Sequence, residues 1–212
     1  MRVREAGLRV LCRGDVPALH ESHGSTEGDP ASRRRLFDES RETFRRLWSA
    51  KLESRYDAEL CWQSILGFRM GYATAGRTHL PALDSQGTRV SYSYLYGPGS
   101  PYPVEEPSDL GDRFLNVLSS RTPRGRFAGV AFGLANAFPR CKGHVRIGYS
   151  MLEVDGLPSE WVAGANEMDE VWVPSTFNAE TFEAAGVRTP ISVMPLGVNT
   201  SYFRPEGLRF RN

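Results

Sequence analysis

A glycine-rich stretch after the first long apolar run has the residue types that can bind an anion. Gly71, Gly76 and Arg77 lie in the segment GYATAGRT, which differs from a phosphate-binding P-loop by having arginine in place of lysine. Arginine does not simply replace the compact lysine charge, and the spacing is not G-x-G-x-x-G either. An ATPase or a dehydrogenase is therefore disfavoured. Glycines at a strand-to-helix turn still let backbone N–H groups approach a phosphate, and a tight turn without a ligand is the alternative.

A basic segment follows a stretch that we predict to be a strand, Phe114–Ser119. Arg121 and Arg124 come directly after it. Because ligands bind beyond the carboxyl ends of parallel strands, this prediction places both arginines beside the glycine-rich turn, as phosphate or donor contacts. A solvated surface turn is the alternative.

These residues need a parallel sheet to bring them together. Apolar, β-branched runs predict strands at Glu59–Leu66, Thr88–Tyr94, Phe114–Ser119, Phe127–Leu134, Arg146–Ser150, Glu170–Val173 and Ile191–Met194. Helices are predicted between them at Ala75–Gln86, from about Ser159, and at Thr176–Ala185 behind the N-cap Ser175. Strand, short helix and strand at this spacing form a βαβ unit. The fold class is therefore α/β, with a doubly wound, mostly parallel Rossmann-like sheet.

The first third of the sequence contains one clear pattern, an amphipathic helix over Arg33–Leu52. Its apolar residues share one face: Leu36, Phe37, Phe44, Leu47 and Trp48. Such a basic helix can lie on a membrane, but interspersed acidic residues weaken that interpretation, and we favour a helix packed on the domain. A short strand is predicted at Leu8–Leu11.

Composition excludes several classes of protein. The hydrophobic share is 40%, the charged share 24% and the net charge +1, which gives no general bias toward nucleic acid. No apolar run has the length of a membrane span, and no signal peptide is recognised. Three scattered cysteines fit a reducing, cytoplasmic location. Cys141 and His144 have the spacing of a lone ligand pair, so we predict no metal site.

The segment Asp169–Ser175, DEVWVPS, and the segment Pro195–Pro205, PLGVNTSYFRP, carry a resemblance to a known family. Together with Arg146–Glu153 and Leu157–Trp161, they resemble the end of the N-terminal domain in family-4 glycosyltransferases of the GT-B fold. The resemblance reaches back faintly to about Leu60. It implies a Rossmann-like acceptor-side domain (57–198) and a hinge (199–212) toward a missing C-terminal donor domain. It does not cover the first fifty-odd residues, which we interpret as an N-terminal helical extension (1–56) without an assigned role.

The resemblance also implies an activity. It would be transfer of a sugar from a nucleotide-diphosphate sugar to an acceptor hydroxyl, retaining and metal-independent, with no further cofactor, by a chain that is incomplete without its donor domain. Glu153 matches the glutamate of the family's sugar-contact motif, and Ser150 and Trp161 are further acceptor candidates, although tryptophan on this helix is more often a core residue. Glu153 can instead cap the following helix or pair with a local arginine. Pro195, Gly197 and Asn199 form the hinge, and no catalytic residue is assigned.

Two other functions remain open at this point. A non-catalytic carbohydrate- or partner-binding module that retained the fold is the main alternative, and a different Rossmann-like nucleotide binder is the third.

Overall fold

A computed structural model of the protein describes residues 29–97, 100, 102, 105, 110–200 and 203. The chain divides into two compact units, residues 1–52 and 53–212. The predicted strand Leu8–Leu11 lies outside the described residues, as does most of the hinge after Thr200. No helix in the described part is long and apolar enough to cross a bilayer.

The helix predicted at Arg33–Leu52 is confirmed as α2 (Pro30–Glu53). Asp29 caps it, because its side chain accepts hydrogen bonds from the N–H groups of Ala31 (3.1 Å) and Ser32 (3.2 Å). Proline at the first helical position needs no such partner. None of the residues of α2 is buried, and the packing of this helix on the domain stays a prediction.

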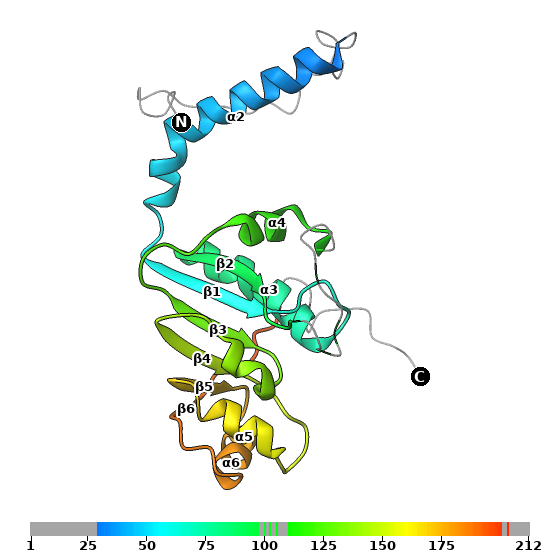
Figure 1. The fold of residues 1–212 in the computed structure, drawn as a ribbon, viewed down its shortest axis with the longest axis vertical. Helices are drawn as coiled ribbons and strands as arrows, with labels where there is room; N and C mark the ends of the chain where they lie inside the picture. Colours follow the sequence, from blue (N-terminus) through cyan, green and yellow to red (C-terminus); the bar gives the residue numbers. More distant parts are fainter. Residues whose placement is uncertain are drawn as a thin grey trace. The chain divides into compact units, whose positions relative to one another are not determined.

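The second unit is a six-stranded, fully parallel sheet flanked by helices (Figure 1), which confirms the predicted fold class. Its strands are β1 (Ala58–Ser64), β2 (Thr88–Tyr94), β3 (Ala128–Phe132), β4 (Val145–Tyr149), β5 (Glu170–Val173) and β6 (Ile191–Val193). Its helices are α3 (Gly71–Ser85), α4 (Arg113–Ser120), the 3₁₀ helix η2 (Ala135–Arg140), α5 (Ser159–Ala165) and α6 (Thr176–Ala184). The strand order is β2-β1-β3-β4-β5-β6, with every neighbouring pair parallel.

Both faces of the sheet are covered, and side chains that alternate along the strands feed two separate cores. Along β3, Val130 and Phe132 belong to the core beneath α3 and α4, whereas Ala131 belongs to the core beneath η2, α5 and α6. All three are completely buried. A strand buried on both faces reads as an unbroken apolar run, which explains why β3, with the sequence AGVAF, could be predicted from the sequence.

One predicted strand, Phe114–Ser119, is wrong. The segment forms α4, and the side chain of Asp112 caps it by accepting hydrogen bonds from the N–H groups of Phe114 (2.7 Å) and Leu115 (3.1 Å). Leu115 and Leu118, three residues apart, are both buried. A short apolar run fits a strand or a helix equally well by composition, and here the cap and the spacing of three decide for a helix.

Candidate functional site

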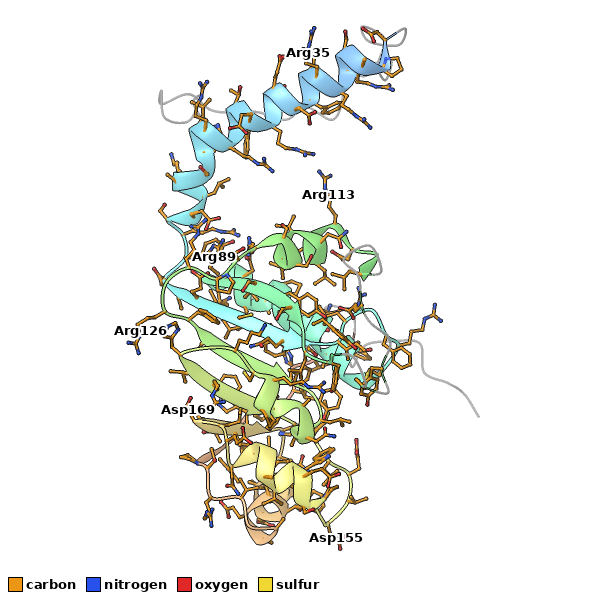
Figure 2. All side chains as sticks on the ribbon, in the orientation of Figure 1. Arg35, Arg89, Arg113, Arg126, Asp155 and Asp169 are labelled. Carbon is orange, nitrogen blue, oxygen red and sulfur yellow. The ribbon has the colours of Figure 1, made fainter. Side chains whose placement is uncertain are left out.

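The two ends of the parallel sheet differ in chemistry. β1 and β3 are neighbours in the sheet. The connection after β1 leads to β2 on one side of this pair, and the connection after β3 leads to β4 on the other side. Open α/β sheets bind ligands at such a switch point, beyond the carboxyl ends of the strands. We use "carboxyl edge" for residues 65–72, 95–97, 102, 105, 133–134 and 150–155, and "amino edge" for residues 53–59, 84–89 and 121–126. Figure 2 shows Asp155 at the opposite end of the sheet from Arg89 and Arg126.

Tyr72, in the first turn of α3, ties the end of β1 to the end of β4. Its hydroxyl lies 3.2 Å from Oγ of Ser150, donates to the carbonyl of Met151 (3.1 Å) and accepts from the N–H of Met151 (3.1 Å). Burial raises the pKa of Tyr72, and the charge of Glu153 and the neighbouring Tyr102 raise it further, although its hydrogen bonds oppose this. Tyr72 therefore stays a neutral phenol that positions the carboxyl edge.

Ser150, an acceptor candidate from the sequence, lies beneath this tyrosine. It is completely buried, and its backbone N–H donates to the carbonyl of Trp172 (3.1 Å). Its hydroxyl therefore contributes to the shape of the edge through Tyr72 and does not form part of the exposed surface.

A small cavity opens beside these residues. Its volume is about 160 Å³, and it is lined by Tyr96, Ser100, Tyr102, Leu134, Asn136, Ala137 and Arg140. The rings of Tyr96 and Tyr102 lie 4.6 Å apart, and the Tyr96 hydroxyl accepts a hydrogen bond from the N–H of Leu134 (3.1 Å). Aromatic faces together with amide, hydroxyl and guanidinium groups can bind a polar ligand such as a sugar. Neither tyrosine was among the site residues predicted from the sequence, and both lie in or next to the proline-rich loop (97–107) that follows β2.

Glu153 is exposed in a bend three residues beyond Ser150. Its side chain forms no hydrogen bond or ion pair with the described residues, and α5 begins behind Pro158 without a side-chain cap. The two structural roles considered for Glu153, a helix cap and an arginine partner, are thus not seen in the described part of the chain. Its carboxylate is available to an external ligand, near enough to Tyr72 to affect the pKa of that phenol.

Trp161, the third acceptor candidate, belongs to the interior. It is 9% exposed and packs in the core with Ala135, Ala165 and Phe182. The core interpretation of this residue is correct, and a sugar at the carboxyl edge would not find its indole face at the surface.

The predicted phosphate-binding residues divide between the helix start and the helix interior. Gly71 is the first residue of α3, and the N-cap Met70 makes no side-chain cap, so the first turn of the helix presents free N–H groups. Gly76 lies inside the helix, where an added Cβ would be 2.8 Å from Cδ2 of the buried Leu66. Gly76 is therefore a packing position. The helix begins four residues earlier than predicted because the whole glycine-rich segment is helical.

Arg77 stabilises the carboxyl edge through hydrogen bonds to backbone carbonyl groups. Its guanidinium donates to the carbonyl oxygens of Leu66 (2.9 Å) and Leu110 (2.7 Å). These bonds join the loop after β1 to the start of α4, so this side chain positions the loop.

A carboxylate of the protein itself binds backbone N–H groups directly after β1, four to five residues before the predicted anion site at Gly71. Oε2 of Glu105 accepts hydrogen bonds from the N–H groups of Leu66 (2.6 Å) and Gly67, and Oε1 accepts from the hydroxyl of Tyr92. The pKa of Tyr92 is raised by burial and then by this carboxylate. The N–H groups of Leu66 and Gly67 therefore bind an anionic group, which Glu105 supplies, and an anion site at Gly71 stays a prediction. Glu105 lies in the proline-rich loop after β2, where no pattern in the sequence indicated that its carboxylate would reach the end of β1.

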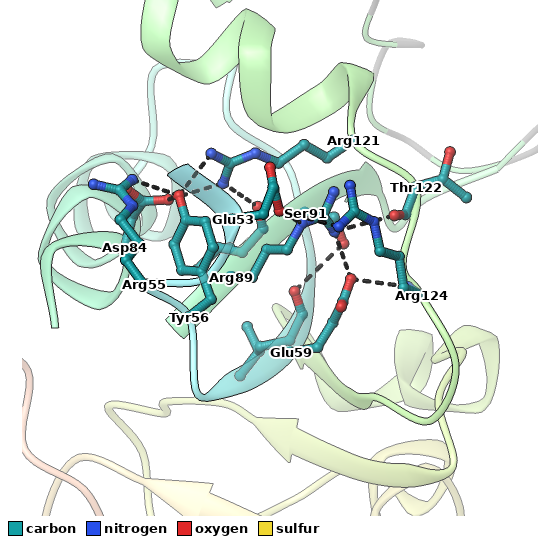
Figure 3. A network of polar contacts seen from close by, with 12 residues as sticks. Glu53, Arg55, Tyr56, Glu59, Asp84, Arg89, Ser91, Arg121, Thr122 and Arg124 are labelled. Atoms are coloured by element: carbon teal, nitrogen blue, oxygen red, sulfur yellow. Dashed lines mark hydrogen bonds and ion pairs between the residues drawn. The ribbon is translucent and has the colours of Figure 1, made fainter. Parts of the chain in front are cut away.

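Arg121 and Arg124 lie at the amino edge, and their predicted placement beside the glycine-rich turn is wrong (Figure 3). Because α4 replaces the predicted strand, the chain returns to the start of the sheet before β3. Arg121 donates to Asp84 (2.8 Å), to the carbonyl of Val90 (2.9 Å) and to the hydroxyl of Tyr56 (2.9 Å). The backbone N–H of Arg124 donates to Glu59 (2.9 Å).

The amino edge is a network of paired charges. Arg89, whose side chain is 8% exposed, donates to Glu53 (2.7 Å) and Glu59 (2.6 Å). Burial alone would raise the pKa of Asp84, but hydrogen bonds from Arg121 and Tyr56 and the nearby arginine charges outweigh it and hold that pKa below 3.8. Since each of these carboxylates has a cationic partner, the network stabilises the fold and leaves little charge for a ligand.

The hinge residues Pro195, Gly197 and Asn199 follow β6 and are exposed. The hydroxyl of Tyr149 donates to the carbonyl of Met194 (2.6 Å), which fixes where this segment leaves the sheet. Three apolar side chains of the segment are also exposed: Met194, Leu196 and Val198. Among the described residues, no group of three or more His, Cys, Asp or Glu side chains could hold a metal ion.

A scan against protein-family models and searches of curated proteins and of solved structures returned no match.

Proposed function

We propose that the second unit is the acceptor-side domain of a glycosyltransferase. The reaction moves a sugar from a nucleotide-diphosphate sugar to an acceptor hydroxyl, with retention of configuration, and a second domain of similar fold holds most of the donor. The observation that carries the proposal is that the carboxyl edge holds both an available carboxylate, Glu153, and a tyrosine-lined cavity, and that Glu153 and Tyr102 of this cavity both lie near enough to Tyr72 to raise its pKa.

The chemistry of this edge suits a carbohydrate. A carboxylate accepts hydrogen bonds from two hydroxyl groups of one pyranose, and tyrosine rings offer an apolar face with a polar end. The resemblance of residues 146–205 to family-4 enzymes points to the same edge.

Glu153 has a defined role in this proposal. It orients the acceptor and accepts a hydrogen bond from the attacking hydroxyl, so that the oxygen is held close to the donor carbon. Tyr72 and Ser150 hold the edge in shape without touching the sugar. The N–H groups at the start of α3, which have no side-chain cap, suit the binding of a donor phosphate.

Transfer from a panel of nucleotide sugars to glycan acceptors tests the proposal, with the protein expressed from its complete gene. Glu153→Gln keeps the shape and one acceptor oxygen but removes the charge. We expect kcat/KM to fall about tenfold or more, which corresponds to about 1.4 kcal/mol of transition-state stabilisation, with an unchanged Tm. Glu160→Gln, the same change at an exposed position of α5, is the matched control and should keep full activity.

Two results would count against this function. Glycan binding that depends on Glu153 without transfer from any nucleotide sugar would favour a non-catalytic carbohydrate-binding module. A lower Tm with intact turnover in Glu153→Gln would make Glu153 structural.

A further inference from the structure

Helix α2 has a partition of charge that its composition alone does not reveal. It carries seven cationic and four acidic side chains. With 3.6 residues per turn, positions 35, 38, 39, 42, 46, 49, 50 and 53 share one side of the helix. All four carboxylates lie on that side: Asp38, Glu39, Glu42 and Glu53.

The opposite side is apolar and aromatic. Leu36, Phe37, Phe44, Leu47 and Trp48 recur at helical spacing, and the first four are between 49% and 63% exposed. Exposed aromatic side chains on one side of a long helix are costly in water unless something covers them.

The cations gather on and beside this apolar side. Arg34, Arg41 and Arg45 form a row that borders Trp48 and Leu52, and Arg33 and Lys51 lie on the apolar side near the two ends. Only Arg35 and Arg46 lie among the carboxylates, and Arg35 is 3.8 Å from Glu39. The acidic residues that weaken a membrane interpretation in the linear sequence are therefore on the far side of the helix.

We propose that α2 binds the surface of an anionic lipid bilayer, with Phe37, Phe44 and Trp48 entering the interface and Arg34, Arg41 and Arg45 contacting lipid phosphates. Charge complementarity carries the choice of partner, because apolar side chains bordered by cations, with the acidic side away from them, fit a negatively charged interface. An antiparallel second copy of the helix would bring the rows of Arg34, Arg41 and Arg45 together along the seam. A parallel second copy would bring Arg33 and Lys51 of both copies together on the apolar side, so like charges repel in either arrangement. The proposal does not depend on the proposed transferase function.

Vesicle binding by the whole chain tests this inference. Phosphatidylcholine vesicles with about 30% phosphatidylserine are compared with pure phosphatidylcholine, and binding is followed by co-sedimentation. We expect binding to the anionic vesicles only, weakening as salt screens the surface. Each arginine at the surface contributes about fivefold to partitioning, so Arg41→Gln with Arg45→Gln should lower it by about 25-fold.

The matched control is Arg35→Gln with Arg46→Gln, which removes the same charge from the acidic side and should lower partitioning by less than about threefold. Phe37→Ser with Phe44→Ser should abolish most binding. Because no residue of α2 is buried, all three pairs should keep the Tm of the chain, which excludes misfolding as the cause.

Three results would overturn the proposal: equal binding to neutral and anionic vesicles or to neither, an equal loss in the two arginine pairs, or a lipid-independent dimer that Phe37→Ser with Phe44→Ser dissociates. The last result would assign the apolar side of α2 to a second copy of the chain.

Discussion

Glu105 is the residue whose replacement tests the carboxyl edge most sharply. Its carboxylate accepts hydrogen bonds from two backbone N–H groups, those of Leu66 and Gly67, and from the Tyr92 hydroxyl. A hydrogen bond to a charged group contributes about 1.5–3 kcal/mol to stability, and a neutral one about 0.5–1.5 kcal/mol. The difference is about 1–1.5 kcal/mol per bond, so removing the charge from three such bonds should cost about 3–4.5 kcal/mol.

Glu105→Gln can keep all three contacts. The amide oxygen can face the two N–H groups, and Tyr92 can turn its hydroxyl hydrogen to the carbonyl of Ser64, which is 3.2 Å away. Glu105→Ala removes the contacts altogether. In a chain of 212 residues, where 1 kcal/mol corresponds to about 2–4 °C in Tm, we expect losses of at least about 6 °C for both variants and the larger loss for alanine.

The same variants have a second readout, because Glu105 occupies two backbone N–H groups that could bind a phosphate in its absence. Freeing them in Glu105→Ala should strengthen the binding of pyrophosphate or a nucleoside diphosphate, measured by titration calorimetry, by about tenfold or more. Glu167→Ala, at an exposed turn after α5, controls for the loss of one negative charge. Unchanged Tm and unchanged anion affinity in Glu105→Ala would refute the assignment of Glu105 to the end of β1.

Three further predictions concern the packing and charges around the site. Arg89→Met should lower the unfolding free energy by about 2–4 kcal/mol in denaturant melts, because Glu53 and Glu59 lose their shared partner; an effect below 1 kcal/mol would show that the amino-edge network is not formed. Gly76→Val should lower the unfolding free energy by about 1–3 kcal/mol, because the added side chain overpacks against Leu66. Gly71→Ala should leave the Tm unchanged or higher, because its Cβ would meet no atom within 4 Å. A larger loss of stability in Gly71→Ala than in Gly76→Val would contradict the placement of α3. Burial holds the pKa of His79 below 6.5, so as the pH falls His79 is protonated in the unfolded chain before it is protonated in the folded chain. The unfolding free energy should therefore fall as the pH drops below about 6.5. His79→Gln should flatten this part of the plot of stability against pH, and an identical plot would contradict the burial of His79.

The strands could be predicted from the sequence because most are rich in β-branched and aromatic residues, and β3 in particular is buried on both faces. β2 and β5 have the predicted bounds, Thr88–Tyr94 and Glu170–Val173, and the other observed strands lie within one to two residues of their predictions. A doubly buried strand needs a continuous apolar run, so local composition and tertiary position agree.

The errors arose where local pattern and tertiary context disagree. Phe114–Ser119 has the composition of a strand, and only the Asp112 cap and the burial of Leu115 and Leu118 make it α4. That single error moved Arg121 and Arg124 to the wrong end of the sheet. A strand at Phe114–Ser119 would end at the carboxyl edge, whereas α4 returns the chain to the amino edge before β3 begins.

The site itself was predictable only in part. Glu153 was found from its motif and lies at the carboxyl edge as expected, but the contacts of Glu105, Tyr72 and Tyr102 join segments that are far apart in sequence. Glu105 reaches Leu66 from the proline-rich loop, across 39 positions. No local pattern encodes such a contact.

The central claim is that a carbohydrate acceptor binds at the carboxyl edge beside Glu153, and an NMR titration tests it most directly. The ¹⁵N-labelled chain is titrated with a panel of mono- and oligosaccharides while the backbone amide shifts are followed. The account predicts that a binding sugar shifts the amides of Tyr72, Met151 and Glu153 and that Glu153→Gln weakens this binding about tenfold. Shifts confined to the amino edge, or shifts at the carboxyl edge with equal affinity in Glu153→Gln, would contradict it.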